Sequence, residues 1–520
     1  MNLTKFNALV ERLRNPEAFD HPVSGVSVIE THISAVLLAG EYAYKLKKPV
    51  DFGFVDFSTL DKRRYFCREE LRLNRRFAPE LYLSVAPVHG SAESPTFREG
   101  GPAIEYAVKM RRFDQDMLLG RCLSQPGLVT GAMMERFAAD VAAVHAAADR
   151  AAPGMGYGTP GVIAANVRDC RAPIGDAGML EGRPRYQGLF EYTENEAHIL
   201  GPWLERRLRD GRVRECHGDL HLGNLFLAGG RIRAFDCIEF NPDLRWIDVA
   251  NDVAFFTMDL RFHGERAFAR QFRNTYLEAS GDYSVLRVLH FYEIYRALVR
   301  AEVACLKEME QAGAGLGDAG AHLDLAVGLM REAPGTPLII THGLSGSGKT
   351  FASGRLLAAS DAIRVRSDVE RDRRVDKGRE RYTDHNVDLI YSRLLELARE
   401  IVSAGYPVIV DATFLKHAQR TRFRRLAADL AVPFRILHCR ASAEELRRRI
   451  VARAQRGADA SEADLAVLEL QIGTQEPLTR DELPYVVEYD TGGRAPLSAL
   501  AAGLNLDMDR APCGPESEDR

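Results

Sequence analysis

The stretch GLSGSGKT, residues 343–350, decides the fold of the C-terminal part of this 520-residue chain. It fits the eight-residue P-loop pattern and lies between an apolar strand candidate, residues 337–341, and a helix candidate. Its glycines permit backbone conformations closed to residues with a Cβ, so successive N–H groups can point at phosphate oxygens. The stretch therefore predicts an ATP site at Gly343, Ser345, Gly346, Ser347, Gly348, Lys349 and Thr350.

We expect specific roles for two residues of this loop. Lys349 would neutralise the β- and γ-phosphates, and Thr350 would ligate Mg²⁺. The helix that begins at Lys349 would add the positive end of its dipole. A chance Gly-Ser loop is the alternative, and the flanking strand and helix argue against it.

From residue 337 onward, strand and helix candidates alternate. Strands are expected at PLIITHG, AIRVRSD, YPVIVDA and PFRILHC, with helices between and after them. Such alternation is typical of a parallel sheet covered by helices. We predict an α/β P-loop NTPase fold with a parallel sheet for residues 336–505.

Two carboxylates stand at strand ends, where open α/β sheets bind their ligands. Asp411 closes the strand VIVD, and a carboxylate there can hold the water shell of Mg²⁺. Asp368 ends the second strand and can accept the proton of a substrate hydroxyl. For each of them the alternative is a helix cap, because Asp also favours strand-to-helix turns.

A basic helix follows the last of these strands. Arg449, Arg453 and Arg456 fall at positions i, i+4 and i+7, on one face. A lid that closes arginines over transferring phosphates would use this spacing. A solvated cationic face is the equally weighted alternative.

Residues 340–490 resemble small P-loop kinases of the gluconate kinase, polynucleotide kinase and zeta-toxin type. The resemblance rests on GLSGSGKT, on SD at 367–368, on VIVDAT at 408–413, and on the Arg-rich lid followed by DASEADLAVLELQ. In such kinases an Asp after the second strand activates the acceptor hydroxyl. The resemblance therefore implies a catalytic role for Asp368.

A second motif, CHGDLHLGNLFL at 216–227, is followed after a Gly-Gly turn by IRAFDCIEF. Phosphoryl transfer to a hydroxyl needs a carboxylate for the proton, an Asn and an Asp for the metals, and a Lys for the phosphates. Asp219 and Asn224 stand five residues apart, and Asp236 stands twelve further on, across a hairpin. The spacing predicts that these three side chains meet on one ATP–Mg²⁺ unit.

These residues closely resemble the aminoglycoside phosphotransferase and choline kinase branch of the protein-kinase-like fold, over about 25–310. By this likeness Asp219 is the catalytic base, and Asn224 and Asp236 hold Mg²⁺. Strand candidates dominate residues 25–110, apart from one strong helix, and helices dominate from about 131. We predict a bilobal α+β domain over residues 1–330.

The phosphate-contacting lysine of this domain is expected in YAYKLKK. Lys45 is preferred, with Lys47 as the alternative because alternation along a strand puts both on one face. The acidic partner is expected to be Glu70, on a helical stripe with apolar residues, and Glu69 is the runner-up. No G-x-G-x-x-G precedes these lysines, so the nucleotide-covering loop stays unassigned.

Composition limits the remaining classes. Apolar residues make up 46% and charged residues 27%, the net charge is −4, and the eight cysteines form no Cys-x-x-Cys pair. These values predict a cytoplasmic globular protein with no membrane partner, no disulfide framework and no zinc ribbon. Residues 506–520 are expected to be a flexible acidic tail.

The leading hypothesis is a bifunctional, ATP- and Mg²⁺-dependent kinase that acts on small-molecule hydroxyl groups at both sites. One alternative makes the N-terminal domain a sensing pseudokinase fused to a P-loop ATPase or kinase. Another is a polynucleotide 5′-kinase. It is disfavoured because residues 336–505 hold 26 Lys and Arg against 23 Asp and Glu, a small surplus for binding nucleic acid. The acceptors and the oligomeric state are left open.

Overall fold

The computed structural model describes residues 1–53, 55–310, 316–332, 335–375, 383–456, 465–491 and 496–508. By its contacts the chain forms two compact units. Unit 1 holds residues 1–264 and 289–330, and unit 2 holds residues 265–288 and 331–520. Within the described ranges, no helix has the length and apolar character needed to cross a membrane.

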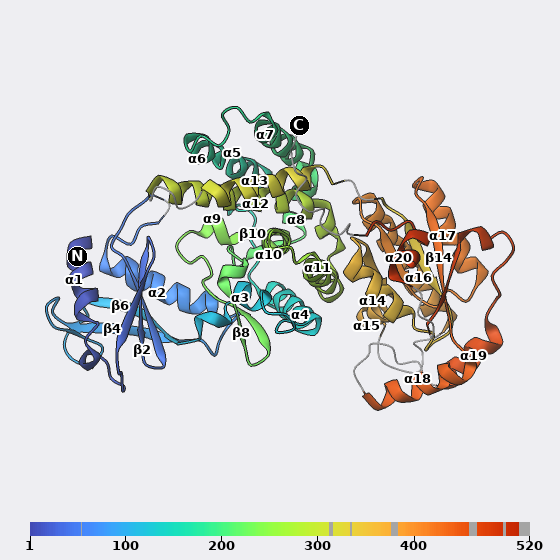
Figure 1. Ribbon diagram of the computed structural model, residues 1–520, viewed down its shortest axis with the longest axis horizontal. Helices are drawn as coiled ribbons and strands as arrows, with labels where there is room; N and C mark the ends of the chain where they lie inside the picture. The colour runs from blue at the N-terminus through green and yellow to red at the C-terminus, as the bar shows by residue number, and fades with distance from the viewer. Residues whose placement is uncertain are drawn as a thin grey trace, which may run out of the picture. The chain divides into compact units, whose positions relative to one another are not determined.

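Unit 1 begins with an antiparallel sheet of strand order β1-β2-β3-β6-β4-β5, which Figure 1 draws in blue beside helix α2. Tyr44 and Leu46 of β3 pack with Leu37 of β2 and with the N-terminal helix, in one core cluster. Lys45 and Lys47 alternate with these apolar residues and point to the opposite face. The elements are α1 (Leu3–Arg12), η1 (Pro16–Ala18), β1 (Val26–Glu30), β2 (Ser34–Ala39), β3 (Tyr42–Lys47), α2 (Leu60–Asn74), β4 (Tyr82–Gly90), β5 (Pro95–Thr96) and β6 (Glu105–Arg111).

The rest of unit 1 is mainly helical and carries two short β-pairs. The hairpin β8–β9 and the pair β7–β10 are both antiparallel. The elements are η2 (Gln115–Met117), α3 (Leu119–Leu123), α4 (Gly131–Ala147), α5 (Pro160–Asp169), α6 (Arg171–Asp176), α7 (Pro184–Ile199), α8 (Gly201–Arg209), β7 (Val213–Glu215), η3 (Leu222–Asn224), β8 (Leu225–Ala228), β9 (Arg231–Ala234), α9 (Pro242–Arg245), β10 (Trp246–Asp248), α10 (Val249–Phe262), α12 (Leu286–Glu310) and α13 (Leu316–Met330). Of α12, residues 286–288 belong to unit 2.

Unit 2 is built on a parallel sheet of strand order β12-β13-β11-β14-β15. Helices α14 and α20 pack on Ile339, Ile409 and Leu437 in one core cluster, while α16 and α17 also contact the central strands. The elements are β11 (Leu338–His342), α14 (Lys349–Ala359), β12 (Ile363–Arg366), α15 (Ser367–Arg374), α16 (Asp384–Ser403), β13 (Val408–Asp411), α17 (His417–Asp429), β14 (Phe434–Arg440), α18 (Ala443–Arg456), α19 (Leu465–Thr474), η6 (Leu483–Tyr485), β15 (Val486–Asp490) and α20 (Leu497–Gly503).

One helix far from the P-loop in sequence is part of unit 2. Helix α11 (Arg266–Ser280), followed by η4 (Tyr283–Val285), packs against α14 and β12. Arg270 of α11 forms an ion pair with Asp361, with an Nη2–Oδ2 distance of 3.0 Å. The side-chain oxygen of Asn274 accepts a 2.8 Å hydrogen bond from the backbone N–H of Arg364. Residues 265–288 lie within the range 1–330 that the sequence assigns to the N-terminal domain, yet their contacts are with the P-loop unit.

The predicted fold classes are confirmed. Unit 1 joins an antiparallel sheet to a mainly helical part, which is the bilobal α+β arrangement expected from the sequence. Unit 2 alternates strands and helices around a parallel sheet, as expected of a P-loop fold. Of the expected acidic tail, residues 509–520 lie outside the described part of the chain.

Candidate active sites

The P-loop of unit 2 is open because its glycines have conformations and contacts that a side chain would not allow. Gly343 has φ +145°, and a Cβ there would lie 2.5 Å from the carbonyl oxygen of Cys439. Gly346 and Gly348 have φ +81° and +87°. These values lie in the left-handed region that favours glycine, so the loop can follow a path along which N–H groups face a ligand.

Lys349 and Ser347 fit a bound phosphate. The ammonium of Lys349 donates 2.9 Å hydrogen bonds to the carbonyl oxygens of Gly343 and Leu344, which hold it across the loop. The hydroxyl of Ser347 is buried, with no hydrogen-bond partner among the described residues. Buried polar groups in proteins are normally hydrogen-bonded, and an oxygen of a phosphate bound at this loop would accept the hydrogen bond of this hydroxyl. Thr350 is exposed at the first turn of α14.

Beside the P-loop lies a cavity of about 1030 Å³, and the predicted carboxylates reach it. Its lining includes Lys349, Thr350, Asp368 and Asp411. Asp411 is the last residue of β13 and accepts a 3.2 Å hydrogen bond from the hydroxyl of Ser353. The next helix begins only at His417, so Asp411 is not a helix cap.

Asp368 lies in the first turn of α15, whose N-cap is Arg366, so this aspartate is not the cap either. Its Oδ1 accepts a 2.6 Å hydrogen bond from Arg371 Nη1. This contact with the guanidinium fixes the orientation of the carboxylate. The structure thus brings both predicted carboxylates to the cavity that the P-loop borders.

Of the three arginines expected in a lid, Arg449 lies at the P-loop. Its Nη1 donates a 2.8 Å hydrogen bond to Thr491 Oγ1 and a 3.4 Å hydrogen bond to the carbonyl oxygen of Gly346. Arg449 also lines the cavity. The backbones of Arg453 and Arg456 continue α18, but their side chains lie outside what the structure describes.

In unit 1, the loop after β7 carries Asp219, and η3, which follows it, ends at Asn224 and brings the two side chains together. Asn224 Nδ2 donates a 2.8 Å hydrogen bond to Asp219 Oδ2, and His221 Nε2 lies 3.3 Å from the same oxygen. Burial opposes ionisation of Asp219, but the imidazoles of His221 and His217 and the guanidinium of Arg300 together lower the pKa of the carboxyl below its ordinary value. Asp219 is therefore held as an oriented carboxylate.

Asp236 follows β9 and reaches across to strand β3. It is one of the described non-glycine residues with positive φ, at +64°, and its N–H donates a 3.1 Å hydrogen bond to the hydroxyl of Tyr82. Such a conformation costs about 1–3 kcal/mol and is typical of functional sites. The carboxylate of Asp236 forms an ion pair with Lys45. Asp236 and Asn224 offer the oxygen ligands that Mg²⁺ takes in proteins, so the side-chain chemistry fits this metal.

The structure pairs Glu70 with both candidate lysines. Lys45 Nζ lies 2.9 Å from Glu70 Oε1, and Lys47 Nζ lies 2.7 Å from Glu70 Oε2. Lys45 is the lysine that contacts Asp236, whereas Lys47 forms an ion pair with Glu239. Lys45 is thus the preferred lysine on geometry, and Lys47 has a different set of partners.

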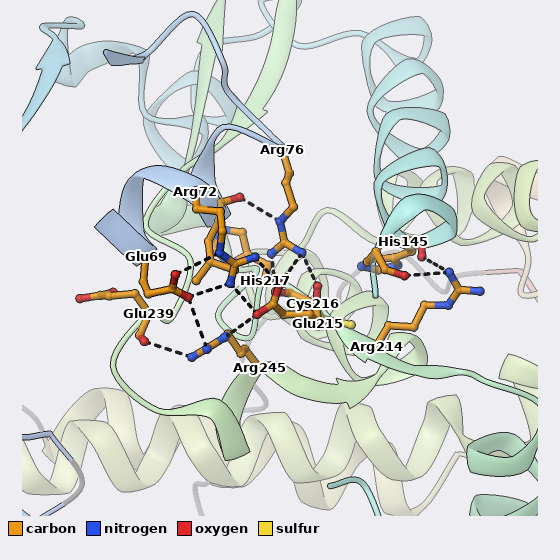
Figure 2. A network of polar contacts seen from close by, with 12 residues as sticks. Glu69, Arg72, Arg76, His145, Arg214, Glu215, Cys216, His217, Glu239 and Arg245 are labelled. Atoms are coloured by element: carbon orange, nitrogen blue, oxygen red, sulfur yellow. Dashed lines mark hydrogen bonds and ion pairs between the residues drawn. The ribbon is translucent and has the colours of Figure 1, made fainter. Parts of the chain in front are cut away.

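Glu69 points into a separate network, seen in Figure 2. Its carboxylate accepts a 2.7 Å hydrogen bond from Arg72, which also binds Glu215 at 2.8 Å. Arg245 Nε binds the same Glu215 at 3.2 Å, and its Nη1 donates a 3.0 Å hydrogen bond to the carbonyl oxygen of Glu239. This network ties α2 to β7 and to the loop after Asp236.

Sequence reasoning missed the residues of helix α10 that hold the Asp219 loop, residues 216–224. Asp252 accepts hydrogen bonds from the backbone N–H groups of His217 (2.7 Å) and Gly218 (2.9 Å). Asp259 accepts a 2.7 Å hydrogen bond from the N–H of Leu222. Their signal is two acids on a helix that is otherwise almost entirely buried and apolar.

Asp252 also belongs to a buried group with His145 and Cys216 whose spacing would suit a metal ion. His145 Nε2 lies 3.2 Å from Asp252 Oδ2. Because both oxygens of Asp252 already accept hydrogen bonds from the Asp219 loop, we interpret this group as the anchor of that loop.

Known proteins with similar sequences place the chain in a family. The uncharacterized protein Rv2004c of Mycobacterium tuberculosis is 31% identical over 467 residues, which cover 86% of this chain and 91% of that protein. The same values hold for the uncharacterized protein Mb2027c of Mycobacterium bovis. The chain belongs to their family. A family model described as an AAA domain also matches residues 338–478, which include the P-loop and both carboxylates of unit 2.

The comparison with solved structures includes two kinases among its matches. A choline/ethanolamine kinase family protein from Mesorhizobium loti is 11% identical with a TM-score of 0.39, over 63% of this chain and 95% of that chain. A sugar kinase from a Janibacter species is 20% identical with a TM-score of 0.24, over 32% of this chain and 91% of that chain.

Proposed function

We propose that this protein transfers the γ-phosphoryl group of ATP to hydroxyl groups of small molecules, with Mg²⁺, at one site in each unit. The observation that supports this proposal most strongly is a shared set of side chains. In unit 1, Lys45 pairs with Asp236 and Asn224 with Asp219, and a 3.0 Å backbone hydrogen bond from the N–H of Phe235 to the carbonyl oxygen of Asn224 links the segments of the two pairs. In unit 2, Lys349, Thr350, Asp368 and Asp411 line one cavity. Phosphoryl transfer needs this combination, because its catalysis is mostly positioning and charge stabilisation.

In unit 1, Asp219 would accept the proton of the acceptor hydroxyl. The hydrogen bond from Asn224 and the neighbouring His221 fix its carboxylate, so little reorganisation is needed. Lys45, held between Glu70 and Asp236, would bind phosphate oxygens. Asn224 and Asp236 would hold the metal, which when bound neutralises charge on the triphosphate.

In unit 2, Lys349 and the backbone of residues 343–348 would bind the phosphates. Thr350 and Asp411 would hold the metal, Asp411 through its water shell. Asp368 would accept the proton of the acceptor, and its bond to Arg371 keeps it oriented toward the cavity. Arg449 would stabilise charge that develops on the transferred group. We also propose a cytoplasmic location, supported by the seven described cysteines, none of them in a disulfide.

A second candidate makes unit 1 a nucleotide or ligand sensor and leaves phosphoryl transfer to unit 2. The observation in its favour is the short turn between β1 and β2, residues 31–33, which contains no glycine. This turn is closed by a 3.0 Å hydrogen bond from Ser34 N to Thr31 Oγ1. A loop of this kind offers fewer free N–H groups to a triphosphate than a glycine-rich loop does.

Two single-site variants separate these candidates. The full-length chain is incubated with γ-labelled ATP, Mg²⁺ and a pool of small metabolites, and the labelled products are resolved. We expect Asp219→Asn to lose one set of products and Lys349→Ala to lose another, each by at least about 100-fold, since general bases and phosphate-binding groups contribute on this order. Lys48→Met, which removes a lysine paired with the exposed Glu30, is the matched control.

If Asp219→Asn leaves every labelled product unchanged, unit 1 is not a kinase and the sensor candidate holds. A wild-type chain that labels no acceptor, and neither binds nor hydrolyses ATP, would refute phosphoryl transfer at both sites.

A further inference from the structure

Unit 1 contains a second lysine that the phosphoryl-transfer chemistry does not use. Lys45 and Lys47 share Glu70, each on its own carboxylate oxygen, at 2.9 Å and 2.7 Å. Lys45 continues to Asp236 and Lys47 continues to Glu239. The five side chains form one chain of charges, in the order Asp236, Lys45, Glu70, Lys47, Glu239.

Exposure falls along this chain of charges. The side chain of Asp236 is 42% exposed and that of Lys45 is 12% exposed, whereas Lys47 and Glu70 are fully buried and Glu239 is 4% exposed. Only the end at Asp236 and Lys45 is accessible to a ligand. Lys47 lies inside, with its ammonium 4.9 Å from the centre of the Phe57 ring. It therefore acts on a ligand only through its neighbours.

Because both lysines contact Glu70, the partners of this carboxylate determine how easily Lys45 can approach a phosphate. If Glu70 had Lys45 alone, that lysine could approach a phosphate only by weakening its pairing with a buried carboxylate, which is costly. Lys47 supplies a second, permanent cation on the other oxygen of Glu70. Glu239 in turn balances Lys47, and its carbonyl oxygen is fixed by Arg245 (Figure 2).

We propose that Lys47 and Glu239 are positioning residues of the unit 1 site, which keep Glu70 neutralised so that Lys45 is available to the phosphates of ATP. This inference rests on the proposed ATP site of unit 1. Lys47 also links strand β3 and helix α2 to the segment after Asp236. This link keeps Lys45 and Asp236, the proposed metal ligand, in fixed positions relative to each other.

The test measures binding of Mg²⁺–ATP by calorimetry on the full-length chain carrying Lys349→Ala, so that the signal comes from unit 1. In this background we expect Lys47→Met to raise Kd, and KM for ATP, on the order of tenfold while kcat changes less than about threefold, because Lys45 stays with Glu70. Lys47→Arg keeps the charge and should restore Kd to within about threefold of the parent. Lys48→Met is the control on the neighbouring position and should bind like the parent.

Lys47→Met alone leaves Glu239 as a buried charge and can unfold the unit, which thermal unfolding will show. The pair Lys47→Met with Glu239→Gln removes both charges together and is expected to fold. This folded pair should still show the tenfold rise in Kd. A purely structural role predicts parent-like binding.

If folded Lys47→Met, or the folded pair Lys47→Met with Glu239→Gln, binds Mg²⁺–ATP with a Kd within about twofold of the parent, the inference is overturned. The proposed function stays intact in that case. A tenfold rise in Kd for Lys47→Arg would contradict the proposal that the charge of Lys47 is what supports binding. If the Lys349→Ala parent itself binds no Mg²⁺–ATP, the proposed site of unit 1 fails, and this inference fails with it.

Discussion

At Gly343 the P-loop depends on the absence of a side chain. A Cβ there would meet Cys439 O at 2.5 Å and Ser347 Oγ at 2.7 Å, and the backbone already has φ +145°. We expect Gly343→Ala to weaken ATP binding in unit 2 by at least about tenfold, because strain of about 1–3 kcal/mol must be relieved by moving the loop. The measurement is Mg²⁺–ATP titration of the full-length chain, which resolves the two sites.

Gly473→Ala is the matched control, since a Cβ at this position of α19 meets nothing within 4 Å. It should bind like wild type. Equal affinities for Gly343→Ala and wild type would show that the loop conformation does not define the site.

At the same scale, the sequence predicts residues that the structure brings into contact, but it leaves two pairs of alternatives open. Alternation put Lys45 and Lys47 on one face of a strand, and periodicity did not separate them. Burial and partners do: Lys45 contacts Asp236, and Lys47 is enclosed. Glu69 and Glu70 are successive on a helix and so point about 100° apart. Which of the two faces the lysines depends on how α2 packs, and that is a tertiary property.

Among the elements, helix α10 fixes the Asp219 loop of unit 1 through Asp252. Burial alone would raise the pKa of this carboxyl, but the hydrogen bond and charge of His145, with the N–H of His217, lower it to about 2. A folded pKa below the ordinary value of about 3.9 gives stability that is fully present above pH 4 and is lost as the pH falls toward 2. The shift corresponds to about 2 kcal/mol.

We therefore expect Asp252→Asn to lower the unfolding temperature of unit 1 by roughly 5 °C at pH 7, with the difference from wild type shrinking between pH 4 and pH 2. Thermal unfolding across this pH range is the measurement. Asp243→Asn, at an exposed position, is the control. A difference that grows toward acid pH would contradict the assignment of Asp252 as an ionised anchor.

The elements of unit 2 were largely predictable because each strand and helix carries its own local pattern. Helix α11 is the exception. Its amphipathic pattern predicts a helix but not its partner, and the contacts of Arg270 with Asp361 and of Asn274 with Arg364 join residues about ninety positions apart. Long-range packing of this kind decides the extent of a unit and leaves no periodic signal in the sequence.

For the whole molecule, the order of the two folds followed from two motifs, GLSGSGKT and CHGDLHLGNLFL, because phosphate chemistry restricts which residues can occupy them. The support around each motif, such as Asp252 and Asp259, was not predicted, since buried acids on a helix become meaningful only when their partners are known. We propose that the chain has two independent sites for Mg²⁺–ATP.

The stoichiometry of Mg²⁺–ATP binding to the full-length chain tests this claim most directly. Calorimetric titration of wild type should give two equivalents, Lys45→Met and Lys349→Ala should each give one, and the double variant none. One equivalent in wild type, or two in either single variant, would contradict the account.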